Sequence, residues 1–186
     1  MHMNEQPAAA AIAAMVHADG FAQADALLAG FAAALVQQGW RVGGLLHERR
    51  RLPSGRGGMF LVDVQTAEEY CISQDLGRDA RGCSVSTAGL AQASAVLRRA
   101  LAQPPDLVIV NRFGAQEAQG GGFAAEMLAL AEAHIPFVTA VAHKHLDAWT
   151  HFCGAAAEHL PADAAALQAW WARSAPGAPG TGAGHG

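Results

Sequence analysis

The sequence is poor in cysteine, and the few cysteines follow no ligand spacing. Its 186 residues include only Cys71, Cys83 and Cys153, an odd number without a CxxC pair. This pattern argues against both a zinc knuckle and a disulfide framework. Because the chain does not use disulfides, we expect it to work in the cytosol.

Long apolar runs and a strong positive charge are also missing. An alanine-rich stretch at residues 8–14 has no basic segment before it, and no apolar run approaches the roughly 20 residues of a membrane span. We therefore expect neither a signal peptide nor a membrane partner. A formal net charge of −4 gives little electrostatic support for nucleic acid. The one basic cluster, residues 48–51, is interpreted as a solvated turn between strands, with an anion contact as the alternative.

What the chain does contain is an alternation of apolar strands with amphipathic helices. Hydrophobic residues make up 52% of it and aromatic residues only 6%, as in helices packed on a central sheet. Apolar runs predict strands at residues 12–17, 40–47, 107–110 and 135–141, and a β-hairpin at residues 59–64 and 70–73. Helical spacing predicts helices at residues 24–38, 86–103, 123–134, 144–152 and 161–173. The fold class is therefore α/β, a three-layer domain with a mostly parallel sheet and an inserted β-hairpin.

The predicted domain covers residues 11–173. Residues 1–10 are expected to be an N-terminal extension, and residues 174–186 (SAPGAPGTGAGHG) a disordered Pro, Gly and Ala tail. Ligands of such sheets bind beyond the carboxyl ends of the strands. The site is therefore expected in the loops that follow strands, at residues 17–25, after residue 47, and at residues 111–122.

The first of these loops stands where a P-loop would stand but lacks its chemistry. A working P-loop needs a Lys for the terminal phosphates and a Ser or Thr for magnesium. Ala24, Asp25 and Ala26 occupy the end of the loop instead. Two interpretations stay open: the helix N-terminus with Asp19 and Gly20 holds an anion in another way, or the loop is a tight turn with an Asp cap.

The order of parts resembles the P-loop family of small nucleoside-triphosphatases related to the thermophilic and cancer-related NTPases. The resemblance covers residues 11–145 and includes GWRVGGLL, LVDV, DLVIVNRFG and IPFVTAV. In that family an Asp-Glu pair ends a strand and serves magnesium and water activation. Here the corresponding positions are Asn111 and Arg112. The resemblance thus implies a P-loop-NTPase-like fold in which the acidic pair and the P-loop Lys are absent, so we expect neither a nucleotide ligand nor hydrolysis.

A more specific resemblance, over nearly the whole domain, is to a family of uncharacterised bacterial proteins that form a degenerate branch of that fold. It is carried by ISQD (residues 72–75), RGC (81–83), NRFG (111–114), Gln116-Glu117 and GGGF (120–123). Members are often encoded beside molybdate transport genes. The resemblance therefore implies a role in molybdenum handling, with molybdate, tungstate or a related oxyanion as the ligand.

Two loops contain groups that can recognise an oxyanion. Guanidinium, amide and backbone N–H groups donate hydrogen bonds to such ions, and a thiolate can act as a soft ligand. The candidate binding residues are Arg81, Cys83, Arg112, Gln116, Glu117, Gly120, Gly121 and Gly122. Glu117 is expected to accept a proton or to orient Arg112. In the alternative interpretation Arg112 pairs internally with Glu117 or Asp75, and the glycines only allow close packing.

Three histidines, His17, His47 and His143, end predicted strands and are expected to converge. When protonated they can hydrogen-bond an oxyanion, and when neutral they can ligate a metal. The later histidines lack the spacing of a pair of metal ligands on a helix. The late tryptophans are interpreted as packing residues or as part of a subunit interface, which would make the chain a homo-oligomer; they are Trp149, Trp170 and Trp171.

These patterns together predict a non-hydrolytic protein that binds a small inorganic oxyanion, for storage, delivery or regulation of molybdenum. One alternative is a nucleoside-triphosphate phosphohydrolase that has moved its catalytic groups to Asp19, Asp25 and Glu117. The other is a regulatory module that binds another protein through its late tryptophan-bearing helices.

Overall fold

A seven-stranded sheet forms the centre of the computed structural model, which describes residues 10–18, 20–74 and 84–177. The strand order is β4-β3-β2-β7-β8-β1-β9. The strands are β1 (Ile12–His17), β2 (Val42–Arg51), β3 (Gly57–Asp63), β4 (Glu69–Cys71), β7 (Leu107–Phe113), β8 (Phe137–Ala142) and β9 (Ala157–Pro161). Parallel pairing joins β2, β7, β8, β1 and β9, whereas β3 pairs antiparallel with β2 and β4 pairs antiparallel with β3. The mostly parallel sheet and the predicted β-hairpin are both confirmed.

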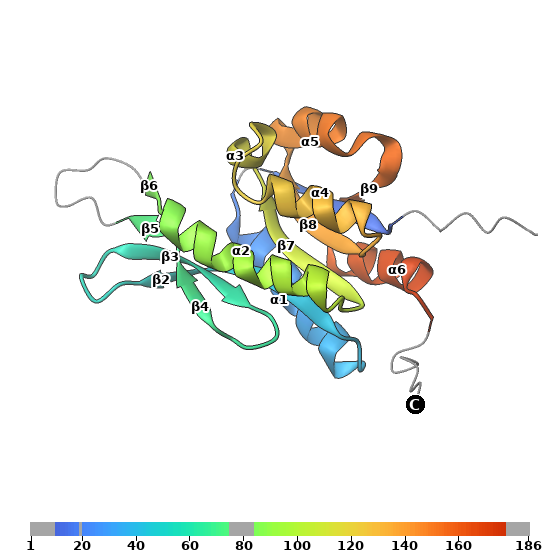
Figure 1. Ribbon diagram of the computed structural model, residues 1–186, viewed down its shortest axis with the longest axis horizontal. Helices are drawn as coiled ribbons and strands as arrows, with labels where there is room; N and C mark the ends of the chain where they lie inside the picture. The colour runs from blue at the N-terminus through green and yellow to red at the C-terminus, as the bar shows by residue number, and fades with distance from the viewer. Residues whose placement is uncertain (1–9, 19, 75–83, 178–186) are drawn as a thin grey trace, which may run out of the picture.

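Helices cover both faces of this sheet (Figure 1). On one face α1 (Ala22–Gln37) contacts α6 (Ala164–Ser174), and on the other α2 (Thr87–Ala102) contacts α4 (Ala124–Glu132). Because side chains alternate along a strand, β1 feeds both cores: Ala13 and Met15 pack under α1, while Ile12 and Ala14 pack on the opposite side. The three-layer α/β architecture is therefore confirmed.

Shorter elements complete the part of the chain that the structure describes. They are β5 (Ser73–Gln74), β6 (Ser84–Val85), α3 (Ala115–Ala118), η1 (His143–His145), α5 (Leu146–Cys153) and η2 (Gly154–Ala156). Since β1, β2, β7 and β8 are parallel, their carboxyl ends lie at one edge of the sheet. The segments that follow these ends, including α3 and η1, consequently gather there.

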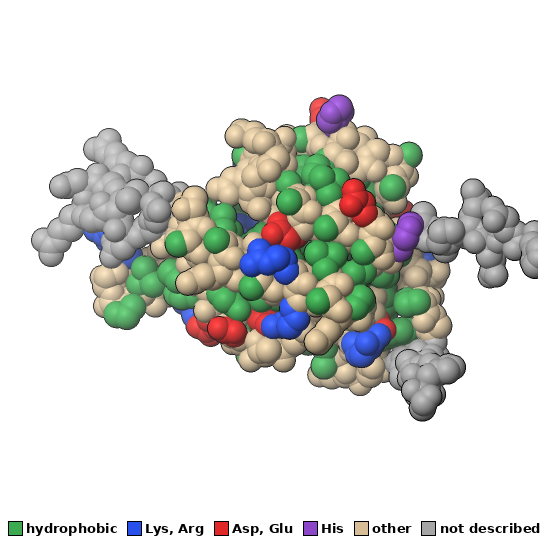
Figure 2. Space-filling view, in the orientation of Figure 1, with side chains coloured by type: hydrophobic (Ala, Val, Ile, Leu, Met, Phe, Trp, Pro, Cys, Tyr) green, Lys and Arg blue, Asp and Glu red, His purple; other side chains and the backbone are tan. Residues whose placement is uncertain are grey.

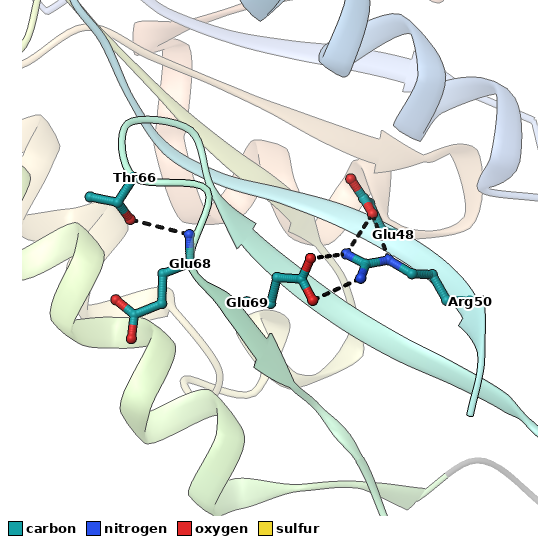
Figure 3. Close-up of polar contacts among 5 residues, drawn as sticks. All are labelled: Glu48, Arg50, Thr66, Glu68 and Glu69. Atoms are coloured by element: carbon teal, nitrogen blue, oxygen red, sulfur yellow. Dashed lines mark hydrogen bonds and ion pairs between the residues drawn. The ribbon is translucent and has the colours of Figure 1, made fainter. Parts of the chain in front are cut away.

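The basic cluster at residues 48–51 belongs to β2, so its interpretation as a turn is wrong. Cross-strand pairing continues from Glu48 opposite Phe60 to Arg51 opposite Gly57. Arg50 forms ion pairs with Glu48 at 2.8 Å and with Glu69 of β4 at 2.6 Å (Figure 3). Pairing with β3 thus extends the strand beyond the apolar run from which its end was predicted.

The predicted loop at residues 111–122 also begins too early. β7 runs on through Phe113, with a register shift against β8 between Val110 and Arg112. Phe113 is buried, and its ring lies 5.1 Å from that of Trp149. Burial of this aromatic residue explains why the polar pair before it stays in the sheet.

The late part of the chain contains a strand, β9, that the sequence did not reveal. Pro161 ends this strand at the edge of the sheet, where its missing N–H costs no ladder bond, and not in the first turn of the last helix as predicted. Asp163 caps α6 by accepting a hydrogen bond from the Ala166 N–H at 2.7 Å. The helix includes Ser174, and the Ala175 N–H donates to the Trp171 carbonyl, so the predicted tail starts too early. Residues 178–186 lie outside the described part.

The visible face in Figure 2 carries acidic and basic side chains beside one another over α2 and α4. Pairs that involve α2 include Arg98 with Glu126 at 3.8 Å and Arg99 with the buried Asp63 at 2.6 Å. Among the described residues no helix is both long and apolar enough to cross a membrane.

Candidate functional site

A cavity of about 300 Å³ lies at the carboxyl edge of the sheet. Small-ligand sites occupy roughly 300–1,000 Å³, so this one has the size of a compact site. Strands β2 and β7, the turn α3 and the segment η1 supply its polar lining, which consists of His47, Asn111, Arg112, Gln116, Glu117, Lys144 and His145. The edge predicted to hold the site is therefore where the structure places a cavity.

Arg112, predicted to donate to an anion, is held in a cluster of three side chains. Its Nη2 donates to Asp25 Oδ2 at 2.6 Å and lies 3.0 Å from His47 Nδ1. Asp25 Oδ2 lies 3.1 Å from the same ring nitrogen. The guanidinium also stacks on Phe21, with 3.7 Å from Cζ to the ring centroid. The internal partner of Arg112 is thus Asp25 of α1, and the expectation of Glu117 in that role is wrong.

Burial and charge oppose one another in this cluster. Burial would raise the pKa of Asp25, but the hydrogen bond from His47 and the positive charge of Arg112 outweigh it, so the pKa lies below its usual value. For Arg112, burial is the largest influence and lowers the pKa, with a smaller lowering from Arg49, while Asp25 raises it. Arginine still stays protonated at any physiological pH. Asp25 and Arg112 therefore form an ionised pair at the cavity wall.

Several buried polar atoms at this edge have no hydrogen-bond partner among the residues described. They are Arg112 Nε, His47 Nε2, His17 Nε2 and Asn111 Oδ1. A buried polar atom left unpaired costs about 1–3 kcal/mol, and more than 90% of such atoms in native proteins are paired. Arg112, His47 and Asn111 line the cavity, so a ligand that enters it can supply acceptor atoms to the two nitrogens and a donor to the Asn111 oxygen.

Glu117 has a structural role that differs from the predicted one. Its Oε2 accepts from the Gly114 N–H at 3.0 Å, and its Oε1 accepts from the Phe123 N–H at 3.2 Å. Both oxygens thereby hold the segment between β7 and α4. The carboxylate holds this segment of backbone and does not orient Arg112.

The glycine amides that were expected to surround an anion are mostly engaged in the turn. The Gly120 N–H donates to the Glu117 carbonyl at 3.0 Å, and the Gly121 N–H donates to the Gln116 carbonyl at 2.8 Å. Gly122 adopts a φ of +54°, and a Cβ there would lie 2.0 Å from Glu117 Oε1. The missing side chain of Gly122 thus leaves room for the Glu117 carboxylate that closes the turn. The prediction that all three amides donate to an oxyanion is therefore wrong for Gly120 and Gly121.

The three histidines at strand ends do not form a metal site in the described structure. His17 is buried. Its Nδ1 lies 2.6 Å from the carbonyl oxygen of Ala18, and its ring packs against that of Phe21. His143 is exposed in η1. Among the described residues, no three His, Cys, Asp or Glu side chains could hold a metal ion together. Only His47 of the three lines the cavity.

The remaining predicted residues fall into two groups. Gln116 lines the cavity, and Gly20 is exposed with a φ of +105° just before α1. Asp19, Arg81 and Cys83 lie outside the described residues. The first turn of α1 has Phe21 as its N-cap without a side-chain hydrogen bond, so Asp25 acts as the partner of Arg112 and not as a cap.

Sequence reasoning missed two contributors to the site. Phe21 was not considered, although it directly precedes the helix in the first loop. Lys144, the only lysine of the chain, follows β8 and lines the cavity beside His145. Its place after a buried parallel strand was the signal that could have identified it.

Comparison with known proteins identifies the family of this chain. Residues 12–170 match the family described as "Protein of unknown function (DUF2478)". The chain belongs to the DUF2478 family. Over 150 residues, 79% of the chain, it is 40% identical to the protein named "Molybdenum import ATP-binding protein ModC 2" of Bradyrhizobium diazoefficiens. The chain spans only 16% of that relative's length.

Two solved structures share the fold of this DUF2478 chain. A human cancer-related nucleoside triphosphatase superposes with a TM-score of 0.60 at 16% identity, covering 81% of this chain and 87% of that one. THEP1 from the hyperthermophile Aquifex aeolicus gives a TM-score of 0.59 at 14% identity, covering 80% and 87%. The predicted P-loop-NTPase-like fold is therefore confirmed, and at these identities the likeness concerns the fold alone.

Proposed function

We propose that this chain binds a small oxyanion of the molybdate and tungstate class in the cavity at the carboxyl edge of its sheet, without hydrolysing a nucleotide. One observation carries the proposal. Arg112 Nε and His47 Nε2 are buried nitrogens without a partner in the described part, and both residues line the cavity. Oxyanions offer the acceptor oxygens that these groups lack.

Cationic groups in the cavity lining can contact an anion, with Asp25 as the counterion of Arg112. Arg112 and Lys144 contribute positive charge to its lining, and His47 and His145 can add more when protonated. The one carboxylate in the lining, Glu117, has both oxygens engaged by backbone N–H groups.

Asp25 and Phe21 position the guanidinium for this task. Asp25 fixes Nη2, and Phe21 supports the flat face of the group. An arginine immobilised before the ligand arrives loses little conformational entropy on binding. When His47 Nδ1–H donates to Asp25, Nε2 of a protonated ring donates toward the ligand, so the carboxylate orients the imidazole as well.

The ligand class follows from the molybdenum relative. The 40% identical segment belongs to a protein named for molybdenum import, and we transfer molybdenum, but not ATP binding, to this chain. The first loop supports this choice, because Ala24, Asp25 and Ala26 stand where a P-loop has its Lys and Ser or Thr. On this proposal the chain stores, delivers or senses the oxyanion in the cytosol.

Equilibrium dialysis of the full chain against molybdate, tungstate and phosphate, with bound molybdenum, tungsten and phosphorus measured by elemental analysis, tests the proposal. We expect wild type to bind one oxyanion per chain. Loss of one charged hydrogen bond costs about 1.5–3 kcal/mol, so Arg112→Lys, which removes the planar fork, should weaken binding by roughly 10- to 100-fold. Lys144→Ala changes an exposed side chain and keeps the fold, and it should also weaken binding.

Arg41→Ala is the matched control, because this exposed arginine pairs with Asp106 away from the cavity lining. It should leave binding unchanged. The proposal fails if wild type binds none of the three anions, or if Arg112→Lys and Lys144→Ala bind as well as Arg41→Ala does. With ATP or GTP and magnesium, we expect no turnover above the rate without protein.

A further inference from the structure

We propose that this cavity binds an oxyanion group carried on an apolar organic body more tightly than it binds the bare inorganic ion. This inference rests on the proposed function, since it names the ligand class of the same site. The inference follows from the part of the cavity lining that a bare oxyanion would not contact.

That part of the lining is apolar. Strand β3, the segments at β5 and β6, and helix α2 contribute most of it, in Met59, Leu61, Ile72, Val85, Leu90 and Phe123. A bare oxyanion keeps strong hydration, and contact with apolar side chains removes water from it without replacing the hydrogen bonds. Sites for organic ligands typically combine such walls with a few placed polar groups. The apolar wall is therefore unexplained by an inorganic ion alone.

The size of the cavity leads to the same conclusion. Its volume of about 300 Å³ has room for roughly ten water-sized groups, at about 30 Å³ each in liquid water. A tetrahedral oxyanion consists of a central atom and four oxygens. A ligand that fills the cavity therefore carries additional atoms, of about the extent of one ring.

The polar and the apolar lining of the cavity lie side by side, and their positions predict the orientation of such a ligand. In the antiparallel pair of β2 and β3, His47 lies opposite Leu61 and Arg49 lies opposite Met59. Directly opposed residues share one face of a sheet. The imidazole and its apolar neighbour thus face the cavity together, so the charged group of the ligand lies toward His47 and Arg112 while its body lies on β3 and α2.

Isothermal titration calorimetry with inorganic phosphate, molybdate and phenyl phosphate tests this inference on the full chain. Phenyl phosphate and inorganic phosphate present similar oxyanions and differ by one apolar ring. We expect phenyl phosphate to bind at least about 10-fold more tightly, from the area of the buried ring. Met59→Gln and Leu90→Gln change partly exposed side chains of similar length, and each should reduce this ratio several-fold.

Val62→Gln is the matched control, because Val62 is a partly buried neighbour on β3 outside the cavity lining. It should leave the ratio unchanged. Equal affinities for phosphate and phenyl phosphate, or a ratio that survives both Met59→Gln and Leu90→Gln, would overturn the organic ligand while the oxyanion site stands. Absence of binding for all three anions would instead overturn the proposed function, and this inference with it.

Discussion

Asp25 of α1 and Arg112 of β7 are 87 positions apart in the sequence, and their side chains meet at 2.6 Å beside the cavity. Both are mostly buried, with 13% and 16% of the side chain exposed. The pair fixes the Arg112 guanidinium at the carboxyl edge of the sheet, in the wall of the cavity. An anion can bind there without breaking the pair, because Asp25 engages only Nη2 of the guanidinium.

Removal of the carboxylate should destabilise the folded protein. Asp25→Ala leaves the charge of Arg112 buried without its counterion, which costs roughly 3 kcal/mol of unfolding free energy in comparable buried pairs. Urea unfolding measures this value. The control Arg41→Ala removes an ion pair whose arginine is exposed, and we expect it to lower the unfolding free energy by less than about 1 kcal/mol. Equal small losses in both variants would show that the Asp25 and Arg112 pair contributes nothing specific.

The turn between α3 and α4 should be sensitive to one glycine more than to another. Gly120→Ala has open space around the new methyl group, and its φ of +82° makes the cost that of a left-handed alanine, about 1–2 kcal/mol. Gly122→Ala also meets Glu117 Oε1 at 2.0 Å and must displace that carboxylate from its backbone partners. The midpoint temperature of thermal unfolding should therefore be lower for Gly122→Ala than for Gly120→Ala. Equal midpoints would contradict this role of Glu117.

The sequence predicted a strand correctly where an apolar run defined both of its ends. It failed where pairing with a neighbouring strand or burial of a distant residue set the end of the strand. The apolar run of β1 was read correctly as residues 12–17, because each residue is covered by its neighbours on both sides of the sheet. The polar ends of β2 and β7 were missed, since pairing with β3 and burial of Phe113 extend them. The sequence did not predict β9 (AEHLP), because this strand lies at the edge of the sheet and only its Leu160 is buried, so it contains no apolar run.

The cavity lies at the edge of the sheet where the sequence predicted the site, but the sequence did not identify all of the residues that line it. Strand order alone brings His47 and Arg112 together, and their identity as candidates followed from standing at strand ends. The contact of Arg112 with Asp25 depends on the packing of α1 against the sheet, which no local pattern reveals. Likewise, the hydrogen bonds from Gly114 and Phe123 to Glu117 require the three-dimensional path of the turn. The late tryptophans are buried, so their interpretation as packing residues holds and a partner surface made of their side chains is wrong.

Stability should depend on pH through Asp63, which is buried beneath α2. Burial raises the pKa of this carboxyl, but hydrogen bonds from Arg99, Thr66 and the Gln65 N–H outweigh it and lower the pKa below the ordinary 3.8. A lowered pKa in the folded state stabilises the protein above pH 3.8, and the contribution disappears as the pH falls through the folded value. In urea unfolding, the difference between wild type and Asp63→Asn should be constant near neutral pH and narrow below about pH 3.8. A difference that stays constant to pH 2 would contradict this assignment.

Lys144 offers a direct chemical probe of occupancy, because it is the only lysine of the chain. Its exposed side chain should react with trinitrobenzenesulfonate, and an oxyanion in the cavity should slow that reaction several-fold. The α-amino group, followed by peptide mass spectrometry in the same sample, is the internal control. Equal slowing of both amines would indicate a general salt effect and would contradict protection at the site.

A crystal of the full chain grown with tungstate tests most directly whether the anion binds at Arg112 and His47. Tungsten scatters X-rays anomalously, so its position is found without reference to the protein. We expect one peak in the cavity, with a tungstate oxygen within about 3.2 Å of Arg112 and another near His47 Nε2. Tungstate that dialysis shows to be bound, but whose peak lies away from these two side chains, would contradict the proposed site.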